Sequence, residues 1–244
     1  MFSKLLTLAP RSAMRTATVL HIEPLAPQIR LLRLGGPELI GFTADPGQKV
    51  KLRLSCGAKA SYTPARVNPD AGWLDVVFHL HGNDGPLASW AAEARSGAQV
   101  SVLGPARSMA GPTGDEAWAI FLGDETTLGL AVALIDALPP EASILGALEL
   151  APGDVVAADR LRLPLPTIAR EGGYGDVLRA WLADTEIPSG PGVVWLSGHA
   201  GTVVSLRQAL LGRGVPRSLI KVKAYWSDHG HTHRKMLERT HLGA

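Results

Sequence analysis

Short stretches in which apolar and polar residues alternate make up the first half of the chain. Over residues 48–55, Val50, Leu52 and Leu54 alternate with cations, and residues 73–81 repeat the pattern. A period of two is that of a β-strand with one buried face. Weaker strand candidates, separated by turn residues, lie at 14–22, 29–34, 61–67 and 99–103. These strands predict an antiparallel six-stranded β-barrel, with one helix at 86–95.

In the second half, apolar strands alternate with helices. Strands are predicted at 117–122, 143–150, 193–197 and 219–226, and helices up to Leu138 and at 176–183 and 202–211. This order is typical of βαβ units on a parallel sheet. We therefore expect two domains, a barrel over residues 1–112 and an α/β domain over 113–244, joined by the Gly- and Pro-rich stretch 104–114. Ligands of open α/β sheets bind beyond the carboxyl ends of the strands, which here predicts a cleft facing the barrel.

The composition excludes several function classes. Lys and Arg number 24 against 22 Asp and Glu, too small an excess for a bulk electrostatic grip on nucleic acid or an anionic membrane. One cysteine, Cys56, excludes an intramolecular disulfide and fits a reducing cytoplasm. The apolar runs fall short of the ~20 residues that span a bilayer, and the start of the chain does not read as a signal peptide. We expect a cytoplasmic protein without membrane insertion, as a monomer.

Two motifs in the first half could bind a flat, phosphate-bearing cofactor. In Ser61-Tyr62-Thr63-Pro64, the ring could stack on a planar ligand and the hydroxyl could bond to its edge. In the run 81–91, a glycine-rich turn leads into a helix with Pro86 at its start, whose free amides could hold a diphosphate. The alternatives are a buried tyrosine beside a turn and a capped helix that closes the barrel.

Two strand-to-helix turns in the second half lie where parallel sheets bind nucleotides. They are Gly123-Asp124-Glu125-Thr126 and Gly198-His199-Ala200-Gly201. Neither is a G-x-G-x-x-G fingerprint or a P-loop with its lysine, so phosphate binding by a glycine motif is not supported.

Taken in order, these motifs resemble the siderophore-interacting protein family, flavin-dependent ferric-siderophore reductases of the ferredoxin–NADP reductase superfamily. The resemblance covers roughly residues 15–230. It rests on Tyr62-Thr63, His81-Gly82, Gly85-Pro86-x-Ala88-Ser89-Trp90-Ala91, Gly104-Pro105, Gly123-Asp124-Glu125-Thr126 and Tyr225-Trp226. It implies a ferredoxin–NADP reductase-like fold with FAD as cofactor and NADH or NADPH as electron donor.

The resemblance also implies binding residues. The flavin ring would lie against Tyr62 and Thr63, the diphosphate on the helix start near His81, and NAD(P)H near residues 123–126 and Gly198. The implied cofactor-binding residues are Tyr62, Thr63, Arg66, His81, Gly85, Pro86, Ala88, Ser89, Gly123, Asp124, Glu125, Thr126, Gly198 and His199. A basic pocket for an anionic ferric siderophore is assigned to Lys49, Lys51, Lys223 and Trp226.

The chain departs from the family pattern at several positions. Where the family has Arg-x-Tyr-Thr-x-Arg, Ala60 and Ala65 replace both arginines, and Lys59 and Arg66 each lie one step away. One step along a strand points to the other face, which opposes direct replacement. His199 stands in place of a glutamate, and Ala224 in place of a glycine. Because Ala60 offers neither charge nor donor to the diphosphate, we predict that FAD is held loosely.

The lysine rows have two interpretations. Lys49 and Lys51 share one face of a barrel strand, and Lys221 and Lys223 share one face of the last strand. A central parallel strand should be apolar on both faces, so the second pair indicates an edge or an open cleft. The rows either attract a polyanionic chelate or are solvated strand faces.

We predict no resident metal and no catalytic acid, base or nucleophile. His229, His231 and His233 could converge on a metal in an extended segment, but a loose polar tail is the simpler interpretation. No serine lies in a nucleophile elbow.

Three function hypotheses remain. The first is an FAD-dependent reductase that passes electrons from NAD(P)H to a ferric siderophore and releases Fe(II). The second is a siderophore-binding or handling protein on the same fold with weak or lost flavin binding. The third is a flavin reductase-like enzyme for another acceptor. A flavin fits the first because NAD(P)H gives two electrons and ferric iron takes one.

Overall fold

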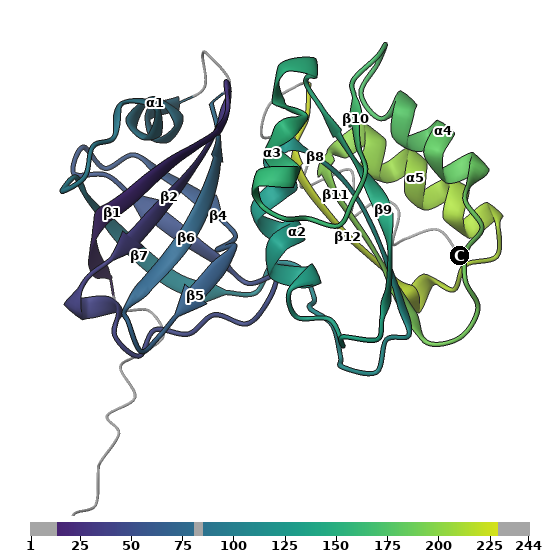
Figure 1. Ribbon diagram of the computed structural model, residues 1–244, viewed down its shortest axis with the longest axis horizontal. Helices are drawn as coiled ribbons and strands as arrows, with labels where there is room; N and C mark the ends of the chain where they lie inside the picture. The colour runs from purple at the N-terminus through teal and green to yellow at the C-terminus, as the bar shows by residue number, and fades with distance from the viewer. Residues whose placement is uncertain (1–13, 81–84, 229–244) are drawn as a thin grey trace, which may run out of the picture.

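The computed structural model describes residues 14–80 and 85–228, which form two domains side by side (Figure 1). The first domain contains β1 (Arg15–Ala26), β2 (Ile29–Gly35), η1 (Pro37–Leu39), β3 (Lys49–Arg53), β4 (Lys59–Tyr62), β5 (Arg66–Asn68), β6 (Trp73–His79), α1 (Gly85–Glu93) and β7 (Gln99–Ala106). The second contains β8 (Trp118–Asp124), η2 (Glu125–Thr127), α2 (Leu128–Ile135), β9 (Ser143–Leu150), η3 (Pro152–Asp154), α3 (Val156–Arg160), β10 (Thr167–Ala169), α4 (Asp176–Asp184), β11 (Gly192–His199), α5 (Ala200–Gly212), η4 (Arg217–Leu219) and β12 (Ile220–Trp226).

The first domain is an antiparallel sheet in the order β4-β3-β7-β1-β2-β6-β5. The prediction of an antiparallel β domain is confirmed, but the sheet has seven strands instead of six. The strand predicted at 61–67 is split into β4 and β5 around Pro64. Proline has no N–H to donate to a strand ladder, so the chain leaves the sheet there and rejoins it at the opposite edge. The described strands therefore do not close the barrel between β4 and β5.

The second domain is a parallel sheet in the order β10-β9-β8-β11-β12, as its strand and helix pattern predicted. The chain moves outward from β8 to β10 and then crosses to β11, so the order reverses between β8 and β11. The carboxyl ends of these two strands form the switch point of the sheet, where open α/β sheets bind ligands. α2 and α3 cover the face toward the barrel, and α4 and α5 cover the other (Figure 1).

Helix α2 lies between the two domains and is buried along its whole length. A helix that is apolar on all its faces is typical of a position buried within a protein. At Gly129 of α2, an added Cβ would lie 3.1 Å from the carbonyl oxygen of Thr63. The glycine therefore allows the helix to approach the chain between β4 and β5.

One apolar core joins the domains. Leu25, Ile29, Leu31 and Ala65 of the first domain pack in the same cluster as the residues of α2, and each is at most 5% exposed. Polar contacts surround this core: the Gln28 amide donates to Asp154 Oδ1 (2.9 Å), and Arg160 donates to the Pro24 carbonyl (2.7 Å). A large apolar interface opposes relative domain motion, so the two domains act as one unit.

Several element boundaries differ from the sequence prediction. β7 continues to Ala106, which pairs with Lys49, so the connection between the domains begins at Arg107 rather than at Gly104. β8 extends to Asp124, and the helix predicted to reach Leu138 ends at Ile135. Over the described residues, no helix combines the length and the apolar character needed to cross a membrane.

Gly146 allows a close approach between β9 and β8, and its replacement should destabilise the protein. Its φ is +135°, and an added Cβ would lie 2.0 Å from the carbonyl oxygen of Phe121. We expect Gly146→Ala to lower the free energy of unfolding by at least about 2 kcal/mol in urea titrations. The control is Gly212→Ala in α5, where an added Cβ meets nothing within 4 Å. There alanine should raise stability by up to about 1 kcal/mol. Equal midpoints for the two variants would contradict this account of the sheet.

Candidate functional site

A cleft of about 190 Å³ opens between the two domains. Its lining comes from β3, β4 and the residue after it, the connection after β7, and β12: Lys49, Ser61, Tyr62, Thr63, Ser108, Lys223, Ala224 and Tyr225. Four of these residues, Lys49, Tyr62, Thr63 and Lys223, are among the predicted site residues. The structure thus brings together residues that are up to 174 positions apart in the sequence.

Tyr62 lines the cleft, and its ring packs on the barrel core. It is the last residue of β4, and its ring centroid lies 4.5 Å from that of Phe78 in the barrel core. Burial raises the pKa of Tyr62 to about 12, because the charged phenolate would lose its hydration there. The side chain therefore remains a neutral phenol at physiological pH.

Thr63 and Tyr225 connect the domains across the cleft. The Thr63 Oγ1 and Tyr225 Oη atoms are 2.9 Å apart, within hydrogen-bond distance. Burial raises the pKa of Tyr225, so both groups stay neutral hydroxyls. Each can donate or accept, which suits the polar edge of a planar ligand.

The cleft is electropositive. Lys49 and Lys223 line it from opposite domains, and the described residues of its lining include no Asp or Glu. Burial and, next, the charge of Lys49 lower the pKa of Lys223. Two neighbouring cations with no carboxylate between them favour an anionic ligand. Lys51 is exposed and does not line this cleft.

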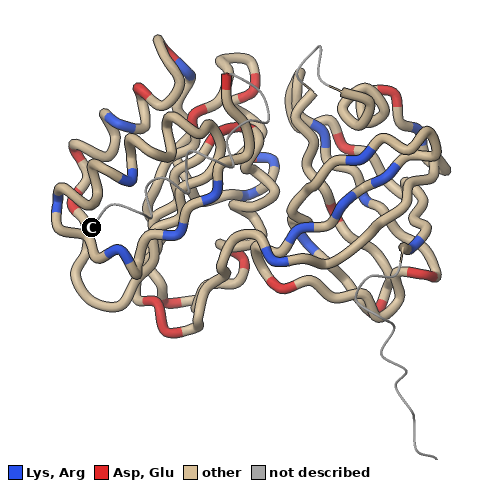
Figure 2. The backbone as a smooth tube through the Cα atoms, turned by 180° about the vertical axis from the view of Figure 1, so that it is seen from behind, with Lys and Arg blue, Asp and Glu red and all other residues tan. Residues whose placement is uncertain are grey.

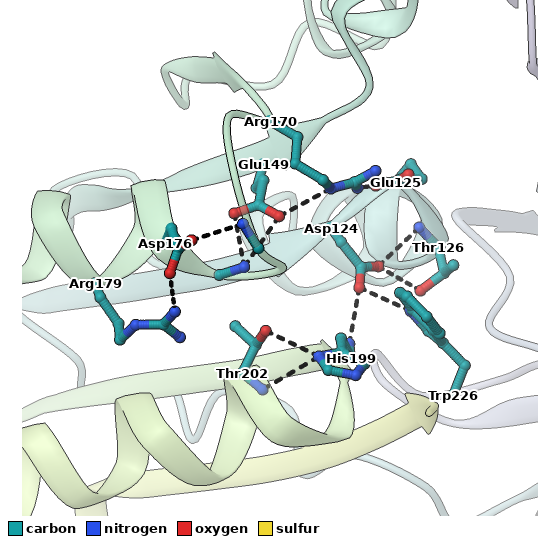
Figure 3. A network of polar contacts seen from close by, with 12 residues as sticks. Asp124, Glu125, Thr126, Glu149, Arg170, Asp176, Arg179, His199, Thr202 and Trp226 are labelled. Atoms are coloured by element: carbon teal, nitrogen blue, oxygen red, sulfur yellow. Dashed lines mark hydrogen bonds and ion pairs between the residues drawn. The ribbon is translucent and has the colours of Figure 1, made fainter. Parts of the chain in front are cut away.

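Asp124 ties together the carboxyl ends of β8, β11 and β12 (Figure 3). Its Oδ1 accepts from the Thr126 amide (3.0 Å) and hydroxyl, and its Oδ2 accepts from the His199 amide (2.8 Å) and Trp226 Nε1 (2.9 Å). Burial raises the pKa of Asp124, and the nearby Glu125 adds to this, whereas the hydrogen bonds act in the opposite direction. The buried carboxylate thus holds the ends of these three strands together, and we call this set of hydrogen bonds the clamp.

A second polar group lies beside it, at the ends of β9 and β10 (Figure 3). The guanidinium of Arg170 pairs with Glu125 and with Glu149 Oε1, the latter at 3.0 Å. Both carboxylates are at most 5% exposed, and Glu149 also accepts from the Gly175 amide. Burial opposes the charge of Arg170, but the two carboxylates outweigh it and raise the pKa of Arg170.

Three aromatic rings cover this end of the sheet. The centroids of Tyr174 and His199 each lie 4.7 Å from that of Trp226, and the Arg170 guanidinium lies 4.7 Å from the Tyr174 ring. The His199 ring caps α5 by accepting from Thr202, and its Nε2 lies 3.1 Å from Asp228. Tyr174 is exposed and offers a surface to a ligand.

At the two turns predicted to bind nucleotide, side chains of the protein itself contact the glycines and accept from the backbone amides. An added Cβ would lie 2.2 Å from Asp124 Oδ2 at Gly198 and 2.3 Å from Thr127 Oγ1 at Gly123, so internal packing requires both glycines. The amides of Thr126, Gly175 and His199 already donate to Asp124 and Glu149. Binding of NAD(P)H here remains a prediction, but these amides are not free to bind its diphosphate. Trp226 Nε1 donates to Asp124, and binding of substrate by Trp226 stays a prediction.

The helix start predicted to hold the FAD diphosphate is only partly described. His81 lies outside the described residues. Gly85, Pro86 and Ser89 of α1 are exposed, Ala88 is half-buried, and the Ser89 hydroxyl donates to the Gly85 carbonyl at 3.4 Å. The first turn of α1 is accessible to a ligand.

The residues that would hold FAD fit its ring better than its phosphates. Ala60 packs partly on the barrel core beside Tyr62, whereas Lys59 is exposed and points to the other face of β4. Arg66 Nε forms an ion pair with Asp136 of the second domain at 2.9 Å. Within the described residues, neither neighbouring cation therefore replaces the arginine that the family has at position 60. Ala65 is 3% exposed in the shared core, where an arginine would bury its charge.

Sequence reasoning named Ser61 and Tyr225 in motifs without giving them a role, and it missed Ser108, Glu149, Arg170 and Tyr174. For Glu149 a signal was available, since it is the one charged residue in the otherwise apolar stretch 144–150 and a central parallel strand is normally apolar on both faces. The described residues hold no group of three or more His, Cys, Asp or Glu side chains placed to bind a metal. The tail with His229, His231 and His233 lies outside them.

Comparisons with known proteins agree with this architecture. A family model described as Siderophore-interacting FAD-binding domain matches residues 57–109, and one described as Siderophore-interacting protein matches residues 116–229. An uncharacterized protein of Mycobacterium tuberculosis is 35% identical over 81 residues, which are 33% of this chain and only 28% of that protein.

Two solved structures extend the comparison. A siderophore utilization protein from T. fusca has a TM-score of 0.78 and 27% identity, covering 90% of this chain and 94% of that chain. A ferredoxin reductase in carbazole 1,9a-dioxygenase has a TM-score of 0.74 and 18% identity, covering 89% of this chain and 70% of that chain. The second likeness concerns the fold alone.

Asp124→Asn should destabilise the end of the sheet. Oδ2 accepts two N–H donors, and an asparagine must either turn its own N–H₂ toward them or give up the Thr126 bonds. We expect a loss of about 1–3 kcal/mol in the free energy of unfolding, measured by urea titration. Asp136→Asn is the control, because its carboxylate is 51% exposed and its ion pair contributes about 0–1 kcal/mol. The clamp would be disproved if the Asp124 variant unfolded at the wild-type midpoint.

Proposed function

Because the chain belongs to the siderophore-interacting protein family, we propose that it is a flavin-dependent oxidoreductase that passes electrons from NAD(P)H through FAD to a ferric siderophore and releases Fe(II). One observation carries the proposal. The interdomain cleft joins Tyr62 and Thr63, which lie in the matched FAD-binding segment, to Lys223 and Tyr225 of the other domain. An aromatic ring, two neutral hydroxyls and two cations then surround one space.

FAD, when bound, supplies the conversion between two-electron and one-electron steps. The chain's own residues orient the flavin and attract the anionic substrate. Tyr62 offers a ring surface, and the hydroxyls of Thr63 and Tyr225 offer hydrogen bonds to a polar edge. No general acid or nucleophile is required, since the reaction transfers electrons and the hard oxygen ligands hold Fe(II) less firmly than Fe(III).

Lys49 and Lys223 are proposed to bind the ferric siderophore. A ferric chelate with several carboxylate or catecholate groups is anionic, and the two ammonium groups approach it from opposite sides of the cleft. Partial burial strengthens the attraction, because water screens the charges less than at an open surface.

The electron donor is proposed to approach the carboxyl ends of β8 and β11. The amides at these turns are bonded to Asp124 and Glu149, so a dinucleotide has to be held through other groups. The exposed Tyr174 ring beside Trp226 is the surface that we assign to it. A cytoplasmic, monomeric protein is part of the same proposal and rests on the lone cysteine and the absence of an obligate-interface signal in the sequence.

A siderophore-handling role without firm flavin binding is the second candidate. The observation that favours it is Ala60, because neither neighbouring cation, Lys59 or Arg66, takes the place of the missing arginine. The fold and the basic cleft would serve such a role without a bound flavin.

Lys223→Ala should weaken the binding of a trianionic ferric chelate. Loss of one charged contact should lower the affinity for the chelate about tenfold at low salt, and the difference in affinity between wild type and variant should shrink at high salt. The measurement is the chelate concentration that gives half the maximal rate of Fe(II) release by the FAD-loaded protein under anaerobic NADH or NADPH.

The same assay gives a pH signature. Because the pKa of Lys223 is lowered, its ammonium loses the proton at a lower pH than an ordinary lysine, and chelate affinity should fall there as pH rises. Lys223→Arg keeps its charge at these pH values and should remove the fall. Wild-type affinity for the alanine variant at low ionic strength would exclude Lys223 from the binding site.

Ala60→Arg should tighten FAD binding. A guanidinium beside Tyr62 can reach a cofactor diphosphate, and a charge-assisted bond contributes roughly 1.5–3 kcal/mol, or about 10- to 100-fold in affinity. The measurement is the dissociation constant from absorbance titrations, with Ala60→Gln as a control for side-chain size without charge. If wild type already holds FAD firmly and the arginine changes nothing, another cation binds the phosphates. If neither protein binds flavin, the handling role is favoured.

A further inference from the structure

Positive charge is concentrated in two segments of the chain. Residues 46–69 and 187–227 contain ten of the 24 Lys and Arg and none of the 22 Asp and Glu. Elsewhere, 14 basic residues face 22 acidic ones. A net charge of +2 therefore conceals a strongly basic part and an acidic remainder.

The first segment presents its cations on one face of a two-stranded ribbon. In the pairing of β3 with β4, Lys51 lies opposite Ser61 and Arg53 opposite Lys59, while Val50 and Leu52 point into the barrel core. Lys49, Lys51, Arg53 and Lys59 thus share the outer face, and we call these four residues the basic ribbon. Figure 2 shows Lys and Arg positions in a row on this side of the molecule.

The basic ribbon contains an unfavourable pair. Arg53 and Lys59 lie directly opposite each other in the strand register, where like charges destabilise a sheet. None of the four cations forms an ion pair with a carboxylate in the described part of the chain. Arg53 donates to the Met14 sulfur at 3.8 Å, a contact with no opposite charge. Like charges that no carboxylate in the described residues neutralises are typical of a surface kept for binding.

The second segment continues the charge across the domain boundary. Lys221 and Lys223 are two residues apart on β12 and share a face with Tyr225, and Lys223 lines the cleft together with Lys49. β12 is an edge strand of its sheet, so the row is accessible. The ribbon and the β12 row therefore meet at the mouth of the cleft.

This face is longer than a small chelate can use. Arg53 lies four residues beyond Lys49, which is about 13 Å along an extended strand. Lys51, Arg53 and Lys59 are exposed and lie outside the cleft lining. A ligand held between Lys49 and Lys223 leaves these three cations unused.

We propose that the basic ribbon and the Lys221–Lys223 row together form a docking surface for an acidic protein partner, which binds over the mouth of the cleft. The partner is finite in size, because an extended polyanion such as nucleic acid or a membrane would also meet the acidic remainder of the surface. Charge complementarity of this kind steers association and is screened by salt. The proposal stands on the charge distribution and does not depend on flavin binding.

The competing explanation is protection of an edge. β4 is an edge strand, and natural proteins place lysines on such strands to prevent aggregation. That role needs charge of either sign, whereas docking of an acidic partner needs positive charge. Variants that reverse the charge of the basic ribbon therefore distinguish edge protection from docking.

The test uses poly-L-glutamate as the acidic polypeptide probe and the full chain. Wild type should bind it with an affinity that falls steeply with salt, and Arg53→Glu/Lys59→Glu should bind at least tenfold more weakly at low salt. The control Arg95→Glu/Arg207→Glu makes the same charge change outside the basic ribbon and the Lys221–Lys223 row. At about 0.15 M salt, where the Debye length is about 8 Å, it should bind within about twofold to threefold of wild type, and the ribbon variant should still bind more weakly than this control. FAD affinity, measured in parallel, should be unchanged by the ribbon variant.

A single substitution gives a second, independent readout. Lys59→Glu places opposite charges across the β3–β4 pair, so it should raise the unfolding midpoint while it weakens binding of the probe. Unchanged probe binding by the Arg53→Glu/Lys59→Glu variant would overturn the proposal and favour edge protection. Tighter wild-type binding to duplex DNA, or to vesicles of phosphatidylglycerol and phosphatidylcholine, than to the probe at the same salt would also overturn it.

Discussion

The apolar contact between helix α2 and the open side of the barrel holds the molecule in its working arrangement. Because the β4–β5 gap is filled by a helix from the second domain, the two domains share one core around Ala65 and Leu31. This contact determines where β12 lies relative to β4, and hence the separation of Lys49 from Lys223 and the hydrogen bond between Thr63 and Tyr225. The cleft is a consequence of the core.

The same core explains one departure from the family pattern and leaves another open. Position 65 is enclosed between the domains, so alanine there satisfies packing and an arginine would not. Position 60 lies on an edge strand and is only partly buried, so packing does not require alanine there. At the far end of the sheet, Asp124 and Glu149 occupy the backbone amides that nucleotide sites use for phosphate. At both ends of the expected cofactor path, groups that could bind phosphate are thus replaced or already hydrogen-bonded within the protein.

The sequence predicted most elements because most are half-buried and periodic. The alternation in 48–55 and 73–81 identified β3 and β6, and the stretch 143–150 coincides with β9. α3 and β10 were missed because five and three residues are too few to show a period. In the site, the strand pattern named the lysines, whereas Tyr62 was named through the family resemblance, because its local pattern also fits a buried tyrosine beside a turn. The Thr63–Tyr225 bond could not be predicted, since 162 residues separate its partners and only the tertiary fold brings them together.

The central claim is that this cleft binds a flavin ring against Tyr62. The most direct measurement is the visible absorbance spectrum of the purified chain, as isolated and during titration with FAD. The account predicts a saturable flavin spectrum whose bands are shifted from those of free FAD, because the ring leaves water for an aromatic, partly buried site. A spectrum identical to that of free FAD at every ratio would contradict it.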